Sequence, residues 1–147
     1  NTAGNRAISG SVLHSAWKVP AAIKGILLTD LAGKTDGRIY AGKILEPKAT
    51  VIATGAGTAL DNTAASTGGA TGFLHVFAAN GTADIVIQES SDNAVGDPYA
   101  TKITFTQVSA LSSQAVSATG TIERWLRTYI TLGTATSVTF AVCVART

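Results

Sequence analysis

The sequence has few of the side chains that most enzymes, metal sites and disulfide frameworks need. Its 147 residues include one cysteine, Cys143, and two histidines, His14 and His75. A single cysteine excludes an internal disulfide, so no oxidising compartment is implied, and its apolar neighbours predict a small buried side chain. His75 shares a predicted strand face with Phe73 and Phe77, which favours a packed or rim histidine over a general base. We therefore predict that the protein is not an enzyme and has no catalytic, cofactor-binding or metal-binding residue.

Charged residues and long apolar runs are also scarce. Charged residues make up 14% of the chain and the net charge is +2, which is too small to argue for nucleic-acid recognition. No run approaches the roughly 20 apolar residues of a membrane helix, and the first residues do not resemble a signal peptide. The chain begins at Asn1 rather than methionine, so processing and a longer product both remain open. Low charge with abundant Ala, Thr, Gly and Ser indicates surfaces that become covered.

The sequence does contain a series of alternating apolar and polar segments separated by turn residues. Such alternation is typical of strands, because successive side chains point to opposite faces. Short strands at this spacing predict an all-β protein, an antiparallel β-sandwich or jelly roll with at most one or two short helices. The predicted strands comprise residues 38–45, 50–54, 71–77, 83–89, 102–106, 121–130 and 137–144. The predicted core consists of inward-facing apolar side chains, namely Leu74, Val76, Ile85, Ile87, Phe105, Leu126, Phe140 and Val142.

The first part of the single predicted domain, residues 1–48, is predicted to hold one short helix and one strand. Pro20 suits a first helical position, and Gly33 suits a helix end. The apolar residues between them fall on one helical face, namely Ile23, Ile26, Leu27 and Leu31. An extended buried segment over residues 20–31 is the alternative. The strand that follows is expected to stop before Pro47, which cannot donate a backbone hydrogen bond.

The second part, residues 49–70, consists from Gly55 onward almost entirely of Gly, Ala, Thr, Ser, Asp and Asn. Such a segment is expected to be flexible, because it cannot bury enough apolar area to fold alone. It is either a surface loop or linker, or an arm that becomes ordered only against a neighbouring subunit. Gly57 is not followed by the Lys-Ser/Thr pair of a phosphate loop. The third part, residues 71–147, is the predicted sandwich core.

A polar loop over residues 90–98 lies within the sandwich region. The acidic and amide side chains around it supply oxygen atoms of the kind that calcium prefers, namely Asp84, Glu89, Asp92, Asn93 and Asp97. Their spacing does not match a calcium loop, and side-chain bonds to the loop backbone explain the same residues.

The strand over residues 121–130 has no purely apolar face. Trp125, Arg127 and Tyr129 share one face with Glu123. Tryptophan, tyrosine and arginine are frequent interface anchors, so these three are our candidate subunit-interface residues. A glycan-stacking platform is a second interpretation. An internal Glu123–Arg127 pair, with Trp125 covering a sandwich edge, is the third.

Several short motifs occur in an order that resembles the C-terminal β-sandwich region of major tail (tail tube) proteins from long-tailed bacteriophages. That family shows a leucine-histidine-valine strand, matched by residues 74–76. A hairpin of the type glutamine- or histidine-serine-x-aspartate follows, and residues 88–92 resemble it. An arginine-aromatic-x-arginine strand follows, matched by residues 124–127. The resembling segments are residues 68–76, 85–92, 103–106, 120–127 and 138–142, and they span about half to two thirds of the chain. The chain departs from the family at its front, where the printed residues match no full tube-forming portion.

The resemblance implies a virion structural protein that is assembled in the host cytoplasm. Its partners would be copies of itself in a ring or lattice, other virion proteins, and DNA that passes without sequence recognition; no membrane is implied. The short front leaves open a capsid or tail decoration protein built on the same sandwich. The residues themselves leave open a carbohydrate-binding β-sandwich module that uses Trp125 and Tyr129.

Overall fold

The computed structural model describes residues 3–9, 12–18, 30–35 and 40–147. It divides into two units, Asn1–Ala7 with Ala41–Thr147, and Ile8–Tyr40. The strands are β1 (Arg6–Ser9), β2 (Val12–Lys18), β3 (Asp30–Thr35), β4 (Tyr40–Val51), β5 (Gly55–Ala56), β6 (Leu60–Asp61), β7 (Ala70–Ala79), β8 (Ala83–Ser90), β9 (Ala100–Thr104), β10 (Ser112–Ala118), β11 (Trp125–Leu132) and β12 (Val138–Arg146).

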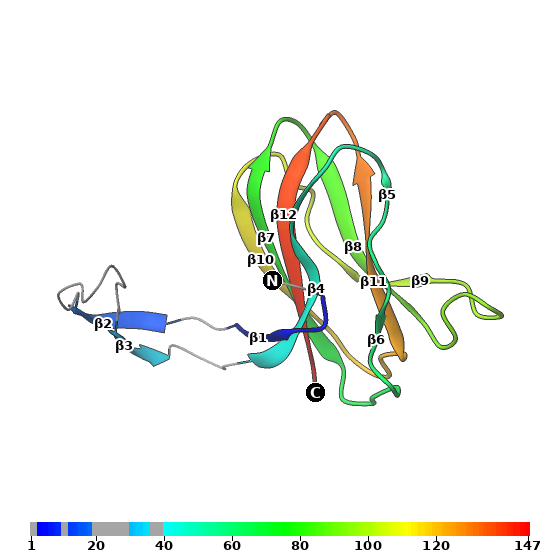
Figure 1. The fold of residues 1–147 in the computed structure, drawn as a ribbon, viewed down its shortest axis with the longest axis horizontal. Coiled ribbons are helices and arrows are strands. Elements are labelled where there is room, and N and C mark those ends of the chain that lie inside the picture. The colour runs from blue at the N-terminus through cyan, green and yellow to red at the C-terminus, as the bar shows by residue number, and fades with distance from the viewer. Residues whose placement is uncertain (1–2, 10–11, 19–29, 36–39) are drawn as a thin grey trace, which may run out of the picture. The chain divides into compact units, whose positions relative to one another are not determined.

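The first unit is a β-sandwich of two sheets packed against each other (Figure 1). One sheet has the strand order β1-β4-β12-β7-β10, and the other has the order β5-β11-β8-β9 with β6 also paired to β11. The pairs that β7, β8, β11 and β12 make are antiparallel. The described residues include no helix. The predicted all-β sandwich is therefore confirmed.

Alternation along the strands places the core between the two sheets. On β8, Ile85 and Ile87 are buried whereas Asp84 is exposed. Every side chain of the predicted core is at most 2% exposed, namely Leu74, Val76, Ile85, Ile87, Phe105, Leu126, Phe140 and Val142. Burial of a side chain of this size stabilises the fold by roughly 1.5–3 kcal/mol, so these positions account for much of the driving force for folding.

The turn at Asn80 connects the two sheets, because β7 lies in one sheet and β8 in the other. The Asn80 side chain accepts hydrogen bonds from the backbone N–H groups of Thr136 (2.9 Å) and Ser137 (3.0 Å). These residues belong to the connection between β11 and β12, which also crosses between the sheets. The β7–β8 turn and the β11–β12 connection are thus joined by hydrogen bonds at one end of the sandwich (Figure 1).

Strand β4 continues through Pro47, so the prediction that this strand stops before the proline is wrong. The pairing with β12 shifts register between Phe140, opposite Ala49, and Val142, opposite Glu46. Such a bulge leaves an extra residue on β4 without a partner, and Pro47 lies within it. A proline in a bulge removes no ladder hydrogen bond.

The polar stretch after β4 lies along the edge of β11. Strands β5 and β6 pair with β11, Gly57 donates a backbone hydrogen bond to Thr128 (2.9 Å), and Ser66 donates one to Ile122 (2.9 Å). The pairing arises within one chain, so the interpretation of an arm that needs a neighbouring subunit for order is wrong. Hydrogen bonds to a strand edge here take the place of the missing apolar burial.

In the second unit, β2 and β3 form an antiparallel pair whose register shifts between His14 and Ala16. Most of the predicted helix, residues 20–29, lies outside the described residues. Leu31, the last residue of that helix, lies instead in β3, together with Gly33. The prediction that Gly33 ends a helix is therefore wrong.

Candidate functional site

The side chains of Trp125, Arg127 and Tyr129 lie on the outer face of β11. Their neighbours along the strand alternate with them and face the core, where Leu126 and Thr128 are at most 2% exposed. Trp125, Arg127 and Tyr129 are each half-buried. The period-2 pattern thus correctly grouped the three candidate residues on one face, although the strand begins at Trp125 rather than at residue 121.

Arg127 is held in place by one residue of the neighbouring strand β8 and by one residue of the loop before β9. Its Nε donates a hydrogen bond to Oε1 of Gln88 (2.9 Å), the residue opposite it on β8. Its guanidinium carbon lies 3.8 Å from the centroid of the Tyr99 ring, a cation–π contact worth about 0.5–2 kcal/mol. The Tyr99 hydroxyl in turn donates to Oδ1 of Asn93 (2.7 Å). Burial raises the pKa of Tyr99, and the nearby Arg127 opposes this effect.

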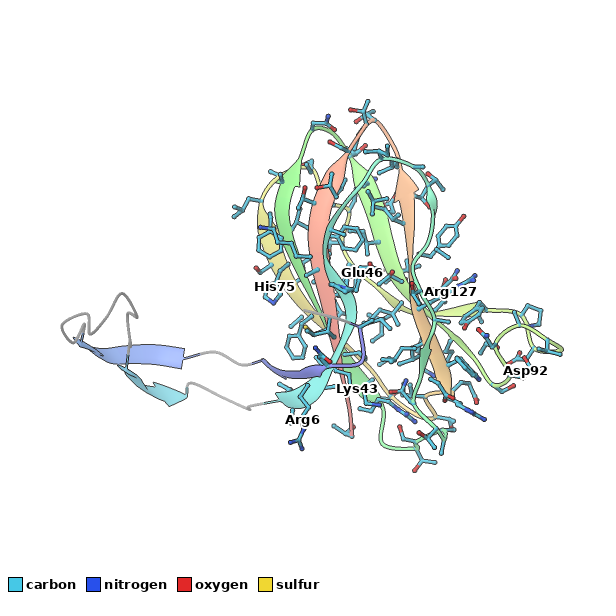
Figure 2. All side chains as sticks on the ribbon, viewed as in Figure 1. Arg6, Lys43, Glu46, His75, Asp92 and Arg127 are labelled. Atoms are coloured by element: carbon cyan, nitrogen blue, oxygen red, sulfur yellow. The ribbon has the colours of Figure 1, made fainter. Side chains whose placement is uncertain are left out.

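These contacts replace the predicted Glu123–Arg127 pair. Glu123 lies next to Glu89, whose Oε2 accepts a hydrogen bond from the Glu123 backbone N–H (3.0 Å). Arg127 points across the sheet toward β8 and β9, where Figure 2 labels it. An arginine with a fixed position loses less side-chain entropy when it binds a partner.

A second arginine lies beside Trp125. The guanidinium carbon of Arg124 lies 5.3 Å from the centroid of the Trp125 ring. Arg124 also makes a two-pronged ion pair with Asp61, with Nε–Oδ1 at 2.7 Å and Nη2–Oδ2 at 2.6 Å. The hydrogen bonds from Arg124 and from the backbone N–H of Thr63 lower the pKa of Asp61 to about 2. The pair therefore stays charged over the whole neutral range.

Two polar groups on this face have no partner within the part of the chain that the structure describes. They are the indole N–H of Trp125 and the hydroxyl of Tyr129, for neither of which a hydrogen bond is found. Tyr129 lies between Val86 of β8 and Ala56 of β5, so its ring is flanked by small or apolar side chains. The face thus offers two aromatic rings, two free donors and two positioned arginines to a binding partner.

The polar loop between β8 and β9 is organised by its own side chains. The Asp92 carboxylate accepts hydrogen bonds from the backbone N–H groups of Val95 (3.1 Å), Gly96 (2.6 Å) and Asp97 (3.1 Å). Burial opposes ionisation, but these donors outweigh it and the pKa of Asp92 lies below its ordinary value. Ser90, which is fully buried, donates to the carbonyl of Asp97 (2.7 Å). The side-chain-to-backbone interpretation of this loop is confirmed.

The acidic residues near this loop are dispersed over different partners. The Asp84 carboxylate accepts a hydrogen bond from the Gln107 side-chain amide, and Glu89 forms an ion pair with Lys102 (3.2 Å). Across the described ranges, no group of three or more His, Cys, Asp or Glu side chains is close enough to hold a metal ion.

The remaining residues that the sequence singled out lie elsewhere. On β7, His75 Nδ1 is 3.0 Å from Oγ of Ser113, while Phe73 is 8% and Phe77 43% exposed. Cys143 is half-buried rather than fully buried, and burial raises the pKa of its thiol. The described backbone places His14 in β2, within the other unit.

Sequence reasoning missed an open pocket of about 540 Å³ on the sandwich. Its cationic side chains are Arg6, Lys43 and Arg146, and small residues of β4, β12 and residues 64–66 complete its lining. The three cations are far apart in the sequence, so no local motif predicts them. Only the strand order, which places β1, β4 and β12 side by side, brings them together.

No known family model, characterised protein or solved structure matches this chain. Within the described ranges, no helix has the length and apolar character needed to cross a membrane.

Proposed function

We propose that the protein is a bacteriophage virion structural subunit that assembles with copies of itself. The form we favour is a tail tube subunit, stacked in rings around the channel that carries DNA. The observation that carries the proposal is the second unit, Ile8–Tyr40, whose described part is a two-stranded sheet.

A unit of this size cannot supply a hydrophobic core of its own. Domains below about 40 residues usually need a disulfide, a metal or a partner subunit, and an isolated two-stranded hairpin is marginal in water. The unit contains no cysteine and one histidine, His14. Its sequence is nevertheless rich in large apolar residues, including Val12, Leu13, Trp17, Ile23, Ile26, Leu27, Leu28 and Leu31. In symmetric assemblies, apolar residues of a small unit are covered by a neighbouring copy of the chain.

The outer face around β11 supports the same proposal from the other unit. Trp125, Arg127 and Tyr129 are of the residue types that anchor interfaces, and two of them carry donors without partners among the described residues. A chain with two different interaction surfaces makes head-to-tail contacts between its copies. Such contacts close into a ring when the rotation between neighbouring copies permits. The motif order that resembles tail tube proteins agrees with this geometry.

Two other roles use the same features. A capsid or tail decoration protein would use the second unit to hold an existing virion lattice rather than a ring of its own kind. A carbohydrate-binding module would use Trp125 and Tyr129 as a stacking platform, and their free N–H and O–H donors favour this second candidate function.

Sedimentation velocity over a wide concentration range, with negative-stain microscopy of the same samples, tests the proposal. We expect rings, tubes or stacked discs at high concentration. A variant in which a short Gly-Ser linker replaces residues 10–38 should keep the β-rich circular dichroism spectrum of the sandwich but remain monomeric. A wild-type protein that stays monomeric at every concentration, and that binds glycans in a Trp125-dependent manner, would establish the module instead.

A further inference from the structure

The open pocket on the sandwich is positively charged, and small residues form its walls. Among the residues that the structure describes, no aspartate or glutamate side chain lines it, whereas Arg6, Lys43 and Arg146 do. The walls between these cations come from small or apolar residues, namely Ala41, Gly42, Ala64, Ala65 and Val144. Such a site suits a short, partly apolar segment that carries negative charge.

Arg146 lacks a carboxylate partner at ion-pair distance in the part of the chain that is described. Its guanidinium donates only to neutral oxygens, namely Oγ of Ser66 (3.0 Å) and the carbonyls of Ala64 (2.7 Å) and Ile122 (3.3 Å). Desolvation lowers the pKa of Arg146, while Glu123 and Glu89 oppose this from a distance. A partly buried cation without a close counter-ion is stabilised when an anion enters the pocket.

The loop of residues 91–99 has the complementary character. It contains two carboxylates, Asp92 and Asp97, and no cation. Oδ2 of Asp97 accepts a hydrogen bond from the backbone N–H of Ser91 (2.8 Å). Oδ1 of Asp97 has no hydrogen-bond partner within the described chain. Val95 lies between the two carboxylates and is 89% exposed. A large apolar side chain is thus presented to solvent by a loop that Asp92 holds in one conformation.

We propose that the loop of residues 91–99 of one copy docks in the basic pocket of the next copy. Val95 packs against the small walls of the pocket, and the Asp97 carboxylate lies near Lys43 and Arg146. Figure 2 places Asp92 and the pair Arg6 and Lys43 at different sides of the sandwich. Donor loop and acceptor pocket are therefore separate patches, as a head-to-tail contact requires. This inference rests on the proposed self-assembly and assigns one of its contacts.

A change of charge on each side of the contact provides the test. Val95→Arg adds a cation to the loop at a site where it disturbs no packing, and it should raise the concentration for half-assembly at least about tenfold. Lys43→Glu removes one of the pocket cations and should weaken assembly similarly. In the double variant the new cation of the loop enters a pocket that carries a new anion, and we expect it to recover part of the lost association. Leu111→Arg, at a site 78% exposed, is the matched control and should assemble like the wild type.

Cysteine cross-linking gives a second measurement that does not depend on affinity. In a Cys143→Ser background, Val95→Cys combined with Ala64→Cys should form disulfide-linked chains of several subunits under mild oxidation. Neither single cysteine should form chains longer than dimers.

The outcomes separate this inference from the proposed function. If the wild type assembles but Val95→Arg behaves like Leu111→Arg, the loop does not dock in the pocket, while self-assembly stands. The same conclusion follows if the double variant stays as weak as the worse single variant. If Lys43→Glu abolishes binding of an oligonucleotide without any effect on assembly, the pocket is an anion site for nucleic acid and the inference is overturned. A wild type that never assembles rejects both proposals.

Discussion

Asp61 and Arg124 form an ion pair whose strength depends on pH in a direction that the structure fixes. The bonds from Arg124 and Thr63 lower the pKa of the Asp61 carboxyl from 3.8 to about 2. Because the folded pKa is the lower one, the stabilisation is present above pH 3.8 and is lost as the pH falls toward 2. We expect Asp61→Asn to have a lower melting temperature than the wild type at pH 7. Near pH 2 the two melting temperatures should be equal. Equal differences at both pH values, measured by thermal denaturation, would contradict this assignment.

Gly72 shows how closely the two sheets approach each other at one position. A Cβ atom there would lie 2.8 Å from Cδ1 of Ile87 and 3.1 Å from Cζ of Phe105. We expect Gly72→Val to destabilise the protein by about 1–3 kcal/mol, because overpacking forces core side chains to move. Gly55→Val is the control, since a Cβ at Gly55 meets nothing within 4 Å. Urea denaturation measures both, and equal costs would show that the effect is not one of core packing.

Among the elements, the loop between β8 and β9 owes its shape to one carboxylate. Asp92 accepts hydrogen bonds from the N–H groups of Val95, Gly96 and Asp97. We expect Asp92→Ala to leave the sandwich folded but to speed amide hydrogen exchange at these three residues, because their donors lose the acceptor. Asp92→Asn keeps one acceptor oxygen and should give an intermediate rate. Unchanged exchange in Asp92→Ala would mean that the chain path alone holds the loop.

The strands that the sequence predicted are those with large apolar side chains on one face. Strands β7, β8 and β12 begin and end within a few residues of the predicted bounds, since burial against the opposite sheet determines them. Strand β10 was missed, because Ser112–Ala118 consists mainly of small and polar residues and, among the described strands, pairs only with β7 at the sheet edge. Its place depends on partners far away in the sequence, which periodicity does not detect.

The candidate residues show the same division between local and long-range information. Trp125, Arg127 and Tyr129 share a face because side chains alternate along any strand, so the sequence alone grouped them. The contacts of Arg127 with Gln88 and Tyr99 come from β8 and from the loop before β9, whereas an internal Glu123 partner was one of the three interpretations that the sequence left open. The basic pocket combines Arg6 with Arg146 from opposite ends of the chain, and only the topology reveals it.

At the scale of the whole molecule, the proposed assembly places Trp125 in a contact with a neighbouring copy. Truncation of a buried interface aromatic costs on the order of 2 kcal/mol or more per contact, and a ring repeats that loss at every subunit. We therefore expect Trp125→Ala to stay folded, because the core side chains lie on the other face of β11, but to sediment as a monomer. Phe77→Ala is the control, because Phe77 is an exposed aromatic (43%) on the other sheet and its loss should leave assembly intact. If Trp125→Ala forms the same particles as the wild type, the outer face around β11 is not the subunit interface, and Trp125 serves only to cover the sheet.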